Sequence, residues 1–332
     1  MISDREMQPE YPLVSVVIPC YKAEKYIARA IDSVLAQPYV DVEVIVVEDG
    51  VFDNTKSIVS RYGDKVKLLS FEQNKGAPAA RNAGLNEVSS EYVMFLDADD
   101  FLEGELLRGL YDILQEENAS VAFGVCIMRW EGKNRERVFI PPKNQTPLQV
   151  VERWLKGNSG PVTCSILWRK SEIIRIGGWN TDITRNQDGE LIIRAMLSGC
   201  TVSVSERGAG IYFHHNNESV SKRIDPVSYR SQEIIEEFVQ KWLNENGSPK
   251  EISDALNQFR LNVALHAYRN SLGDIGRYWE EKWKRNDGQS IILEGGIKST
   301  IPYKVFARIS YSLLGYRRGE LFITWLKKLL NY

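Results

Sequence analysis

Two hydrophobic patterns alternate along the N-terminal part of the chain. Short runs that are apolar almost throughout are predicted strands, and they occupy residues 14–18, 42–47, 66–71 and 92–96. Apolar residues at helical spacing lie between them, at 26–35, after the capping side chains of 53–55, and at 79–88. Such an alternation predicts an α/β fold with a mostly parallel central sheet flanked by helices. Ligands of these sheets bind at the carboxyl ends of the strands.

The pattern becomes less regular in the middle of the chain and then purely helical. Strands are predicted at 121–130 and 137–140, and helices at 148–155 and 188–198. From about Pro226 the spacing is helical, with no clear strand before Ser290. We therefore place a domain boundary near residue 225. It divides the chain into an α/β domain, residues 1–225, and a C-terminal helical extension, residues 226–332.

The composition is that of a globular protein, but its charge is unevenly distributed. The 332 residues include 42 Lys and Arg, 44 Asp and Glu, and 43% apolar residues, which excludes a disordered or fibrous chain. The net charge of -2 gives no reason to expect a nucleic-acid partner. Residues 298–332, however, hold seven basic residues against one acid, Glu320. The C-terminal end is therefore a basic segment of a slightly acidic chain.

The four cysteines indicate a reducing compartment. Cys20, Cys126, Cys164 and Cys200 are widely scattered and form no Cys-x-x-Cys pair, so neither a zinc site nor a disulfide framework is expected. Acidic residues stand near the N-terminus where a signal peptide would need an apolar core. No apolar run reaches the ~18 residues that span a bilayer. We expect a cytoplasmic protein.

Acidic side chains gather where two predicted strands end. Asp97, Asp99 and Asp100 directly follow the fourth strand, and Glu48-Asp49 follows the second. Carboxylates this close repel one another, and a divalent cation with oxygen ligands would stabilise them and bind a diphosphate. For the first group taken alone, an acidic turn that caps the next helix is an equal alternative. We expect the two strands to be neighbours, so that both acidic ends line one cleft.

Four motifs resemble those of family 2 glycosyltransferases in the family's order and spacing. They are VSVVIPCY at 14–21, VIVVEDG at 44–50 with DNT at 53–55, NKGAPAARNAG at 74–84, and FLDADD at 95–100. The resemblance covers roughly the first 220 residues. It implies a GT-A nucleotide-sugar-binding fold and an inverting transfer of a sugar from a nucleoside-diphosphate donor, with a UDP-sugar favoured. The implied acceptor is a glycan or a lipid-linked molecule of cell-surface polysaccharide synthesis.

The same resemblance assigns roles to residues of the donor site. Asp49 would contact the nucleobase and Asp97 the ribose side, while Asp99 would hold a divalent cation, Mn2+ or Mg2+, on the diphosphate. Three further residues of the matched motifs are expected to line the donor site, namely Pro19, Tyr21 and Asn82.

The catalytic base is expected at Asp188. An inverting transfer needs a carboxylate to take the proton of the acceptor hydroxyl. The turn Gly177-Gly178-Trp179, followed by Gln187-Asp188, is similar to the family's Gly-Gly-aromatic turn and its Glu-Asp pair. Considered alone, Asp188 would be a helix N-terminal acid stabilised by the helix dipole, but the donor motifs favour catalysis. Glu190 would compete for this role, and we favour a structural role for it.

Residues 212–221 resemble the family's aromatic, His and Ser-x-Ser segment, which closes over the donor phosphates. His215 has the matching spacing to Ser219 and is expected to contact the metal or the diphosphate, with His214 as its rival. Trp179 would either stack on a sugar face or pack in the core. Acceptor specificity is expected in the irregular segment 125–184.

The chain departs from the family pattern at three places. Lys22 stands where the family often has Asn, Glu48-Asp49-Gly50-Val51 replaces two Asp followed by Gly-Ser, and Gln187 replaces a Glu beside the base. The main alternative is therefore a non-catalytic nucleotide-sugar or carbohydrate-binding protein on the same fold. A Rossmann dehydrogenase is disfavoured because no Gly-x-Gly-x-x-Gly follows the first strand. An aspartyl phosphatase usually carries its nucleophile on the first strand, not the fourth.

The basic C-terminal segment has the pattern of an amphipathic helix. Lys327 and Lys328 lie off an apolar stripe formed by Leu321, Phe322, Trp325, Leu326, Leu329 and Leu330. Such a helix suits an anionic membrane surface, or equally a packing face on protein. The expected acceptor favours a peripheral contact with the inner face of the plasma membrane.

Overall fold

The computed structural model describes residues 11–50, 53–158, 160–215 and 226–285, and these form two compact units. The first unit takes the described residues up to 147, 161–182 and 187–215. The second takes the described residues within 148–160, the short segment 183–186, and residues 226–285. The boundary expected near residue 225 lies outside the described residues, as does the basic segment 298–332.

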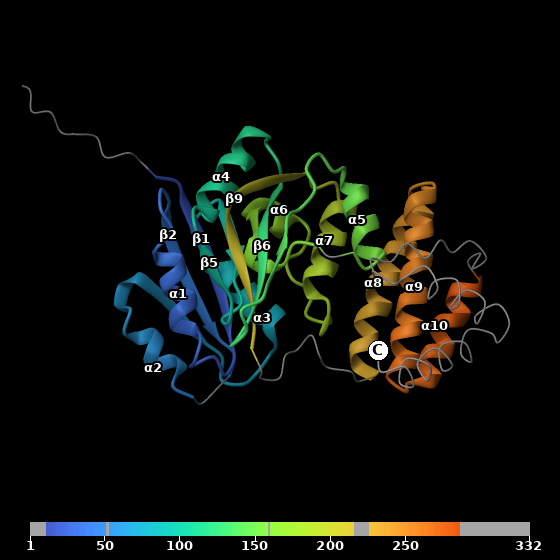
Figure 1. Cartoon of the computed structure of the whole chain (residues 1–332), viewed down its shortest axis with the longest axis horizontal. Coiled ribbons are helices and arrows are strands. Elements are labelled where there is room, and N and C mark those ends of the chain that lie inside the picture. Colours follow the sequence, from blue (N-terminus) through green and yellow to red (C-terminus); the bar gives the residue numbers. More distant parts are fainter. Residues whose placement is uncertain (1–10, 51–52, 159, 216–225, 286–332) are drawn as a thin grey trace, which may run out of the picture. The chain divides into compact units, whose positions relative to one another are not determined.

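The first unit is built on a sheet that has nine strands within the described part of the chain. They are β1 (Leu13–Cys20), β2 (Asp41–Glu48), β3 (Val66–Ser70), β4 (Tyr92–Phe95), β5 (Phe101–Glu103), β6 (Val121–Trp130), β7 (Glu136–Phe139), β8 (Ile166–Arg169) and β9 (Val202–His214). The strands predicted at the four N-terminal apolar runs and at 121–130 and 137–140 are thus confirmed. Figure 1 shows β1 and β2 in blue and β9 in yellow.

The sheet is parallel in one half and mixed in the other. Its order is β3-β2-β1-β4-β8-β6-β9-β5, with β7 paired to β6. All pairs from β3 to β4 are parallel, as the sequence pattern predicted. Strand β8 then runs antiparallel to both β4 and β6, and β5 runs antiparallel to β9. The expectation of a mostly parallel sheet therefore holds for the N-terminal half alone.

Helices cover both faces of the N-terminal half of the sheet. The helices of the first unit are α1 (Ile27–Leu35), α2 (Thr55–Ser60), α3 (Ala77–Glu87), α4 (Leu106–Glu116), α6 (Lys170–Arg175) and α7 (Gln187–Leu197), with short 3-10 turns at Gly63–Lys65 and Thr163–Ser165. Helices α1 and α4 share a buried core with Val14, Val16 and Ile18 of β1. Helix α3 lies on the other face, where a Cβ added to Gly84 would stand 2.3 Å from a methyl carbon of Val17.

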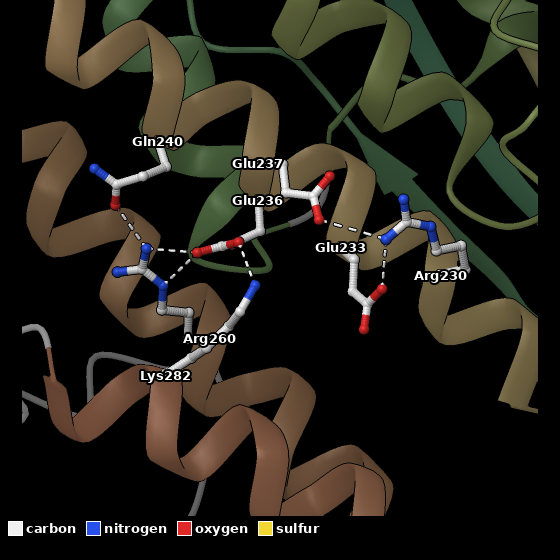
Figure 2. A network of polar contacts seen from close by, with 7 residues as sticks. All are labelled: Arg230, Glu233, Glu236, Glu237, Gln240, Arg260 and Lys282. Carbon is white, nitrogen blue, oxygen red and sulfur yellow. Dashed lines mark hydrogen bonds and ion pairs between the residues drawn. The ribbon is translucent and has the colours of Figure 1, made fainter.

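The second unit is helical, as predicted for the chain after Pro226. It contains most of α5 (Pro147–Leu155) and the helices α8 (Pro226–Glu245), α9 (Lys250–Arg269) and α10 (Gly273–Arg285). Leu261, Leu265 and Trp283 pack together between α9 and α10. A buried polar network on α8, α9 and α10 is drawn in Figure 2. Among the helices that the structure describes, none is both long and apolar enough to cross a membrane.

Candidate active site

Three strand ends meet at one edge of the sheet. Strand β1 pairs in parallel with β2 on one side and with β4 on the other. The sequence predicted that the two acidic strand ends lie on adjacent strands. This prediction is wrong, because β1 lies between β2 and β4. Pro19 near the end of β1, Asp49 after β2 and Asp97 after β4 accordingly lie along one edge. Pro19 is buried, whereas Tyr21 is 50% exposed.

Asp49 holds the loop that leads into α3. Its Oδ1 accepts a hydrogen bond from the Lys75 N–H at 2.6 Å, and its Oδ2 accepts from the Gly76 N–H at 2.9 Å and from Asn74 Nδ2 at 3.0 Å. A carboxylate offers about four acceptor positions, so about one remains, on Oδ1. Gly50 has φ +66, and a Cβ there would lie 2.2 Å from the Gln73 carbonyl carbon. This turn thus requires glycine.

Asp97 is paired with a buried arginine. Arg81 of α3 is 3% exposed and donates from Nη2 to Asp97 Oδ1 at 2.5 Å. Its Nη1 donates to Gln187 Oε1 at 2.8 Å, and its guanidinium carbon lies 4.3 Å from the ring centroid of Trp179. One side chain therefore connects the end of β4 with the first turn of α7.

Asp99 contacts the predicted histidine. His215 Nε2 lies 2.8 Å from Asp99 Oδ2, where an imidazole N–H donates to the carboxylate, and the His215 ring stacks on Tyr26 at 4.9 Å. Burial raises the pKa of Asp99, the charge of Asp97 adds to this, and the hydrogen bond of His215 opposes it. His214 instead stacks on Trp130, with ring centroids 4.8 Å apart. Of the two histidines, His215 is the one at the acidic cluster.

Asp100 has a different role from its two neighbours. It is 1% exposed, and its Oδ1 accepts a hydrogen bond from the Phe213 N–H of β9 at 2.9 Å. Its Oδ2 is buried and finds no hydrogen-bond partner among the described residues. Burial, together with the charges of Asp99 and Asp97, raises the pKa of Asp100 well above the ordinary value. This side chain ties the turn after β4 to β9.

The donor set fits a divalent cation that takes part of its coordination from a ligand. Within the described residues, no group of three or more His, Cys, Asp and Glu side chains is arranged to hold a metal ion. Arg81 contacts one carboxylate oxygen of Asp97, and His215 contacts one carboxylate oxygen of Asp99. The second oxygen of each carboxylate is left for a cation. Mg2+ commonly binds through one or two carboxylates, substrate phosphates and water. The half-exposed pair Asp97 and Asp99 suits that kind of site.

Asp188 lies in the first turn of α7, beside Gln187. Burial raises its pKa, the charge of Arg81 lowers it, and the charge of Asp97 raises it. The charges of Arg81 and Asp97 therefore both act on the Asp188 carboxyl group. Glu190 is 6% exposed and forms a bidentate ion pair with Arg194 at 2.6 and 2.9 Å. That pairing is structural, as favoured from the sequence.

Asn82 and Trp179 are in direct contact. The Asn82 side chain accepts from the Trp179 N–H and donates to the Trp179 carbonyl, both at 2.8 Å. Trp179 is 3% exposed and meets Phe95 edge to face at 5.2 Å. Of the two alternatives for Trp179, the structure favours core packing. The Asn82 side chain holds the Gly-Gly-Trp turn through backbone groups of the turn.

Two arginines of the site were missed by the sequence reasoning. Arg81 links Asp97 to Gln187, and Arg29 donates to the Asp99 carbonyl at 2.6 Å while its guanidinium lies 3.9 Å from the ring centroid of Phe213. Arg81 falls inside the third matched motif, which was a usable signal. Arg29 lies on α1, where an arginine on a helix normally indicates a solvated face.

A comparison with protein families agrees with this geometry. The model "Glycosyl transferase family 2" matches residues 15–173. This part of the chain is similar to family 2 glycosyltransferases. Among the curated proteins similar to this chain, GlyA of Streptococcus pneumoniae is 37% identical over 113 residues, which is 33% of this chain and 16% of that protein. The putative teichuronic acid biosynthesis glycosyltransferase TuaG of Bacillus subtilis is 32% identical over 139 residues, 41% of this chain and 55% of that protein.

Both matches cover about half or less of the relatives' own length. A solved structure resembles this chain over more of its length. S. aureus TarS 1-349 in complex with UDP-GlcNAc superimposes with a TM-score of 0.60 and 21% identity, covering 85% of this chain and 95% of that one. This likeness confirms the predicted GT-A fold.

Proposed function

We propose that this chain is an inverting glycosyltransferase, which moves a sugar from a nucleoside-diphosphate donor to a hydroxyl of a glycan or lipid-linked acceptor. The observation that carries the proposal is the double hydrogen bond of Arg81, which reaches Asp97 at the assigned donor site and Gln187 beside the assigned base. Donor and base thus lie within reach of one guanidinium group. A displacement at a single carbon requires such proximity.

In this mechanism Asp188 takes the proton of the acceptor hydroxyl. The acceptor oxygen attacks the anomeric carbon on the face opposite the diphosphate, the bond to the diphosphate oxygen breaks, and the configuration inverts. Asp49 orients the nucleobase with the acceptor position that its loop contacts leave on Oδ1. Asp97, held by Arg81, contacts the ribose side.

The leaving diphosphate is the proposed ligand of a Mn2+ or Mg2+ ion. Asp99 would hold this ion, with Asp97 beside it and His215 fixing one Asp99 oxygen. A bound divalent cation neutralises the charge that develops on the leaving group. The two half-exposed carboxylates and the imidazole at this strand end support the assignment.

The substrate classes are inferred from relatives and from the C-terminal segment. TarS, a protein of the same fold, has been crystallised with UDP-GlcNAc, which supports a UDP-sugar donor. The name of TuaG supports an acceptor in cell-surface polysaccharide synthesis. The basic, apolar-striped residues 321–330 support a peripheral membrane contact, where a lipid-linked acceptor would be met.

A thermal-shift screen of nucleotide sugars with and without Mn2+ tests the proposal. A ligand that binds only the folded state stabilises it by RT ln(1 + [L]/Kd), about 2.7 kcal/mol at a hundredfold excess over Kd. We expect a UDP-sugar to raise the midpoint temperature of thermal unfolding, and to do so only in the presence of the divalent cation. A nucleotide-sugar panel in which every compound leaves the midpoint unchanged, with either cation, would contradict the proposed function.

A further inference from the structure

A four-residue segment that ends directly before Gln187-Asp188 belongs to the helical unit. Residues 183–186 group with α8 and α9, although the chain before and after them belongs to the sheet unit. Ile183 is 1% exposed, and Asn186 has a left-handed φ of 59°. The left-handed region is uncommon for non-glycine residues, and asparagine is one of the few that adopt it readily. The covalent chain continues directly into Gln187 and Asp188.

A buried serine of α8 anchors this segment. The Ser231 hydroxyl accepts from the Thr184 N–H at 2.9 Å and from the Arg185 N–H at 3.3 Å, and it lies 3.3 Å from Thr184 Oγ1. Ser231 is fully buried. A hydroxyl has two acceptor positions, so both are used by backbone groups of the segment. Removing it would leave two backbone donors without their partner, which is costly in a buried site.

A histidine of α9 supplies a second anchor. Arg185 Nη2 lies 3.4 Å from His266 Nε2, and His266 Nδ1 lies 2.7 Å from the Tyr229 hydroxyl. Arginine has no acceptor, so Nε2 must accept and the imidazole proton sits on Nδ1, facing Tyr229. Burial and the charges of Arg185 and Arg269 lower the pKa of His266, which agrees with this neutral form.

We propose that Ser231 is a positioning residue for sugar transfer. By fixing the backbone of Thr184 and Arg185, it holds the peptide that leads into α7 and so sets the orientation of Asp188, three residues beyond Arg185. A catalytic group has to be held within about 0.5 Å of its productive place. The inference rests on the proposed function, in which Asp188 is the base.

Ser231→Ala in the full chain tests the proposal by three measurements. Hydrogen exchange of residues 184–190 should become faster, because the backbone donors lose their acceptor. Turnover, followed as UDP release from UDP-GlcNAc with Mn2+, should fall at least tenfold in kcat, since displacement by about 1 Å can cost 10²-fold. The Kd of UDP with Mn2+ should change less than about twofold, because the donor residues follow β2 and β4.

Ser248→Ala is the matched control, because that hydroxyl of the same unit donates to the Leu243 carbonyl, at 3.1 Å. It should leave exchange at 184–190 and kcat at wild-type values. If Ser231→Ala does not fold, Arg185→Met removes the His266 contact alone and should change exchange and kcat in the same direction.

Two outcomes overturn the positioning role. In the first, folded Ser231→Ala, or Arg185→Met in its place, shows wild-type hydrogen exchange at residues 184–190. In the second, the same variant shows faster exchange at these residues but keeps the wild-type kcat. Failure of the proposed function gives a different result, in which Asp188→Asn keeps its UDP release. That removes Asp188 as the base and with it the catalytic part of the inference, while exchange, measured without turnover, still decides whether Ser231 anchors the segment.

Discussion

The Asp188 carboxyl group is subject to opposing electrostatic influences. Burial raises its pKa, the charge of Arg81 lowers it and that of Asp97 raises it again. A base acts only when deprotonated, so kcat should fall as pH is lowered through this raised pKa, at a higher pH than an exposed aspartate would give. Arg81→Met should move this acidic limb to still higher pH. If the acidic limb of the kcat–pH profile is unchanged in Arg81→Met, a group other than Asp188 controls that limb.

Replacing the base separates an enzyme from a binding protein. Asp188→Asn removes the proton acceptor at nearly constant volume and should lower the transfer rate by about 10²–10⁴-fold, the usual contribution of a general base. Binding of UDP with Mn2+ should persist. The exposed Asp182→Asn is the matched control and should transfer at the wild-type rate. The substitution of Gln187 for a Glu beside the base suggested a non-catalytic nucleotide-sugar or carbohydrate-binding protein. That alternative is correct if the wild-type protein binds the donor but neither it nor the Asp182→Asn control transfers sugar.

The metal assignment rests on Asp99. Asp99→Ala removes the carboxylate that His215 holds and should weaken UDP binding at least tenfold in the presence of Mn2+, as expected when a cation loses one of few protein ligands. Without a divalent cation the variant and wild type should bind alike. Titration calorimetry measures both constants, with the exposed Asp64→Ala as control. Equal affinities in Mn2+ would remove Asp99 from the site.

At the scale of elements, the sequence predicted the parallel half of the sheet and missed much of the mixed half. Strands β1, β2 and β4 are mostly continuous buried runs, which periodicity detects, and β3 is a short apolar run with one buried residue. Strand β9 was missed because serine and glycine interrupt it and its buried positions alternate irregularly. Strand β5 has three residues, too few for any pattern. Pairing partners far apart in sequence, such as β4 with β8, leave no local signal.

The candidate site was predicted to a similar extent, and for similar reasons. Asp49, Asp97 and Asp99 stand directly after apolar runs, so their place at a strand end could be inferred. Arg81 could not be assigned in the same way, because its partners are 16 and 106 residues away. The contact of Asn82 with the Trp179 backbone was not predicted either, because an amide can bind any backbone group that the fold brings to it. Sequence gives residue types, whereas their partners follow from folding.

The helices of the second unit share a buried ion pair whose removal should be costly. Arg260 of α9 donates to Glu236 of α8 at 2.5 and 2.9 Å and to Gln240, and Lys282 of α10 reaches Glu236 at 2.8 Å (Figure 2). Glu236→Ala would leave the buried Arg260 charge without its carboxylate. We expect a loss of about 3–5 kcal/mol in the free energy of unfolding, measured by denaturant titration.

The same figure supplies the control for that prediction. Arg230, which is exposed, pairs with Glu233 and Glu237 at the surface, so Glu237→Ala should leave stability nearly unchanged. Replacing both members of the buried pair, Glu236→Leu with Arg260→Met, should cost far less than Glu236→Ala, because the fully buried guanidinium is removed with its carboxylate and the remaining Lys282 is partly exposed. If the double variant is as unstable as the single one, the penalty comes from packing and not from charge.

For the whole molecule, the near-neutral total conceals an uneven distribution of charge. Residues 225–332 carry 16 basic and 13 acidic side chains, and the excess lies in residues 298–332, with seven basic residues and one acid. The remainder of the chain has the opposite sign. An acidic sheet unit suits a cation-bound diphosphate, whereas a basic end with apolar residues at helical spacing suits an anionic surface.

This distribution predicts binding to anionic vesicles. The full chain should float with vesicles that contain phosphatidylglycerol and stay in solution with purely zwitterionic ones, because each Lys or Arg near an anionic surface contributes about 1 kcal/mol. Reversing Lys327 and Lys328 to Glu should therefore lower the bound fraction on the order of tenfold or more. The same reversal at Lys241 and Lys250, in the described helices, is the matched control and should float like wild type. A wild-type chain that stays in the soluble fraction with both vesicle types has no such contact, and its C-terminal stripe then packs on protein.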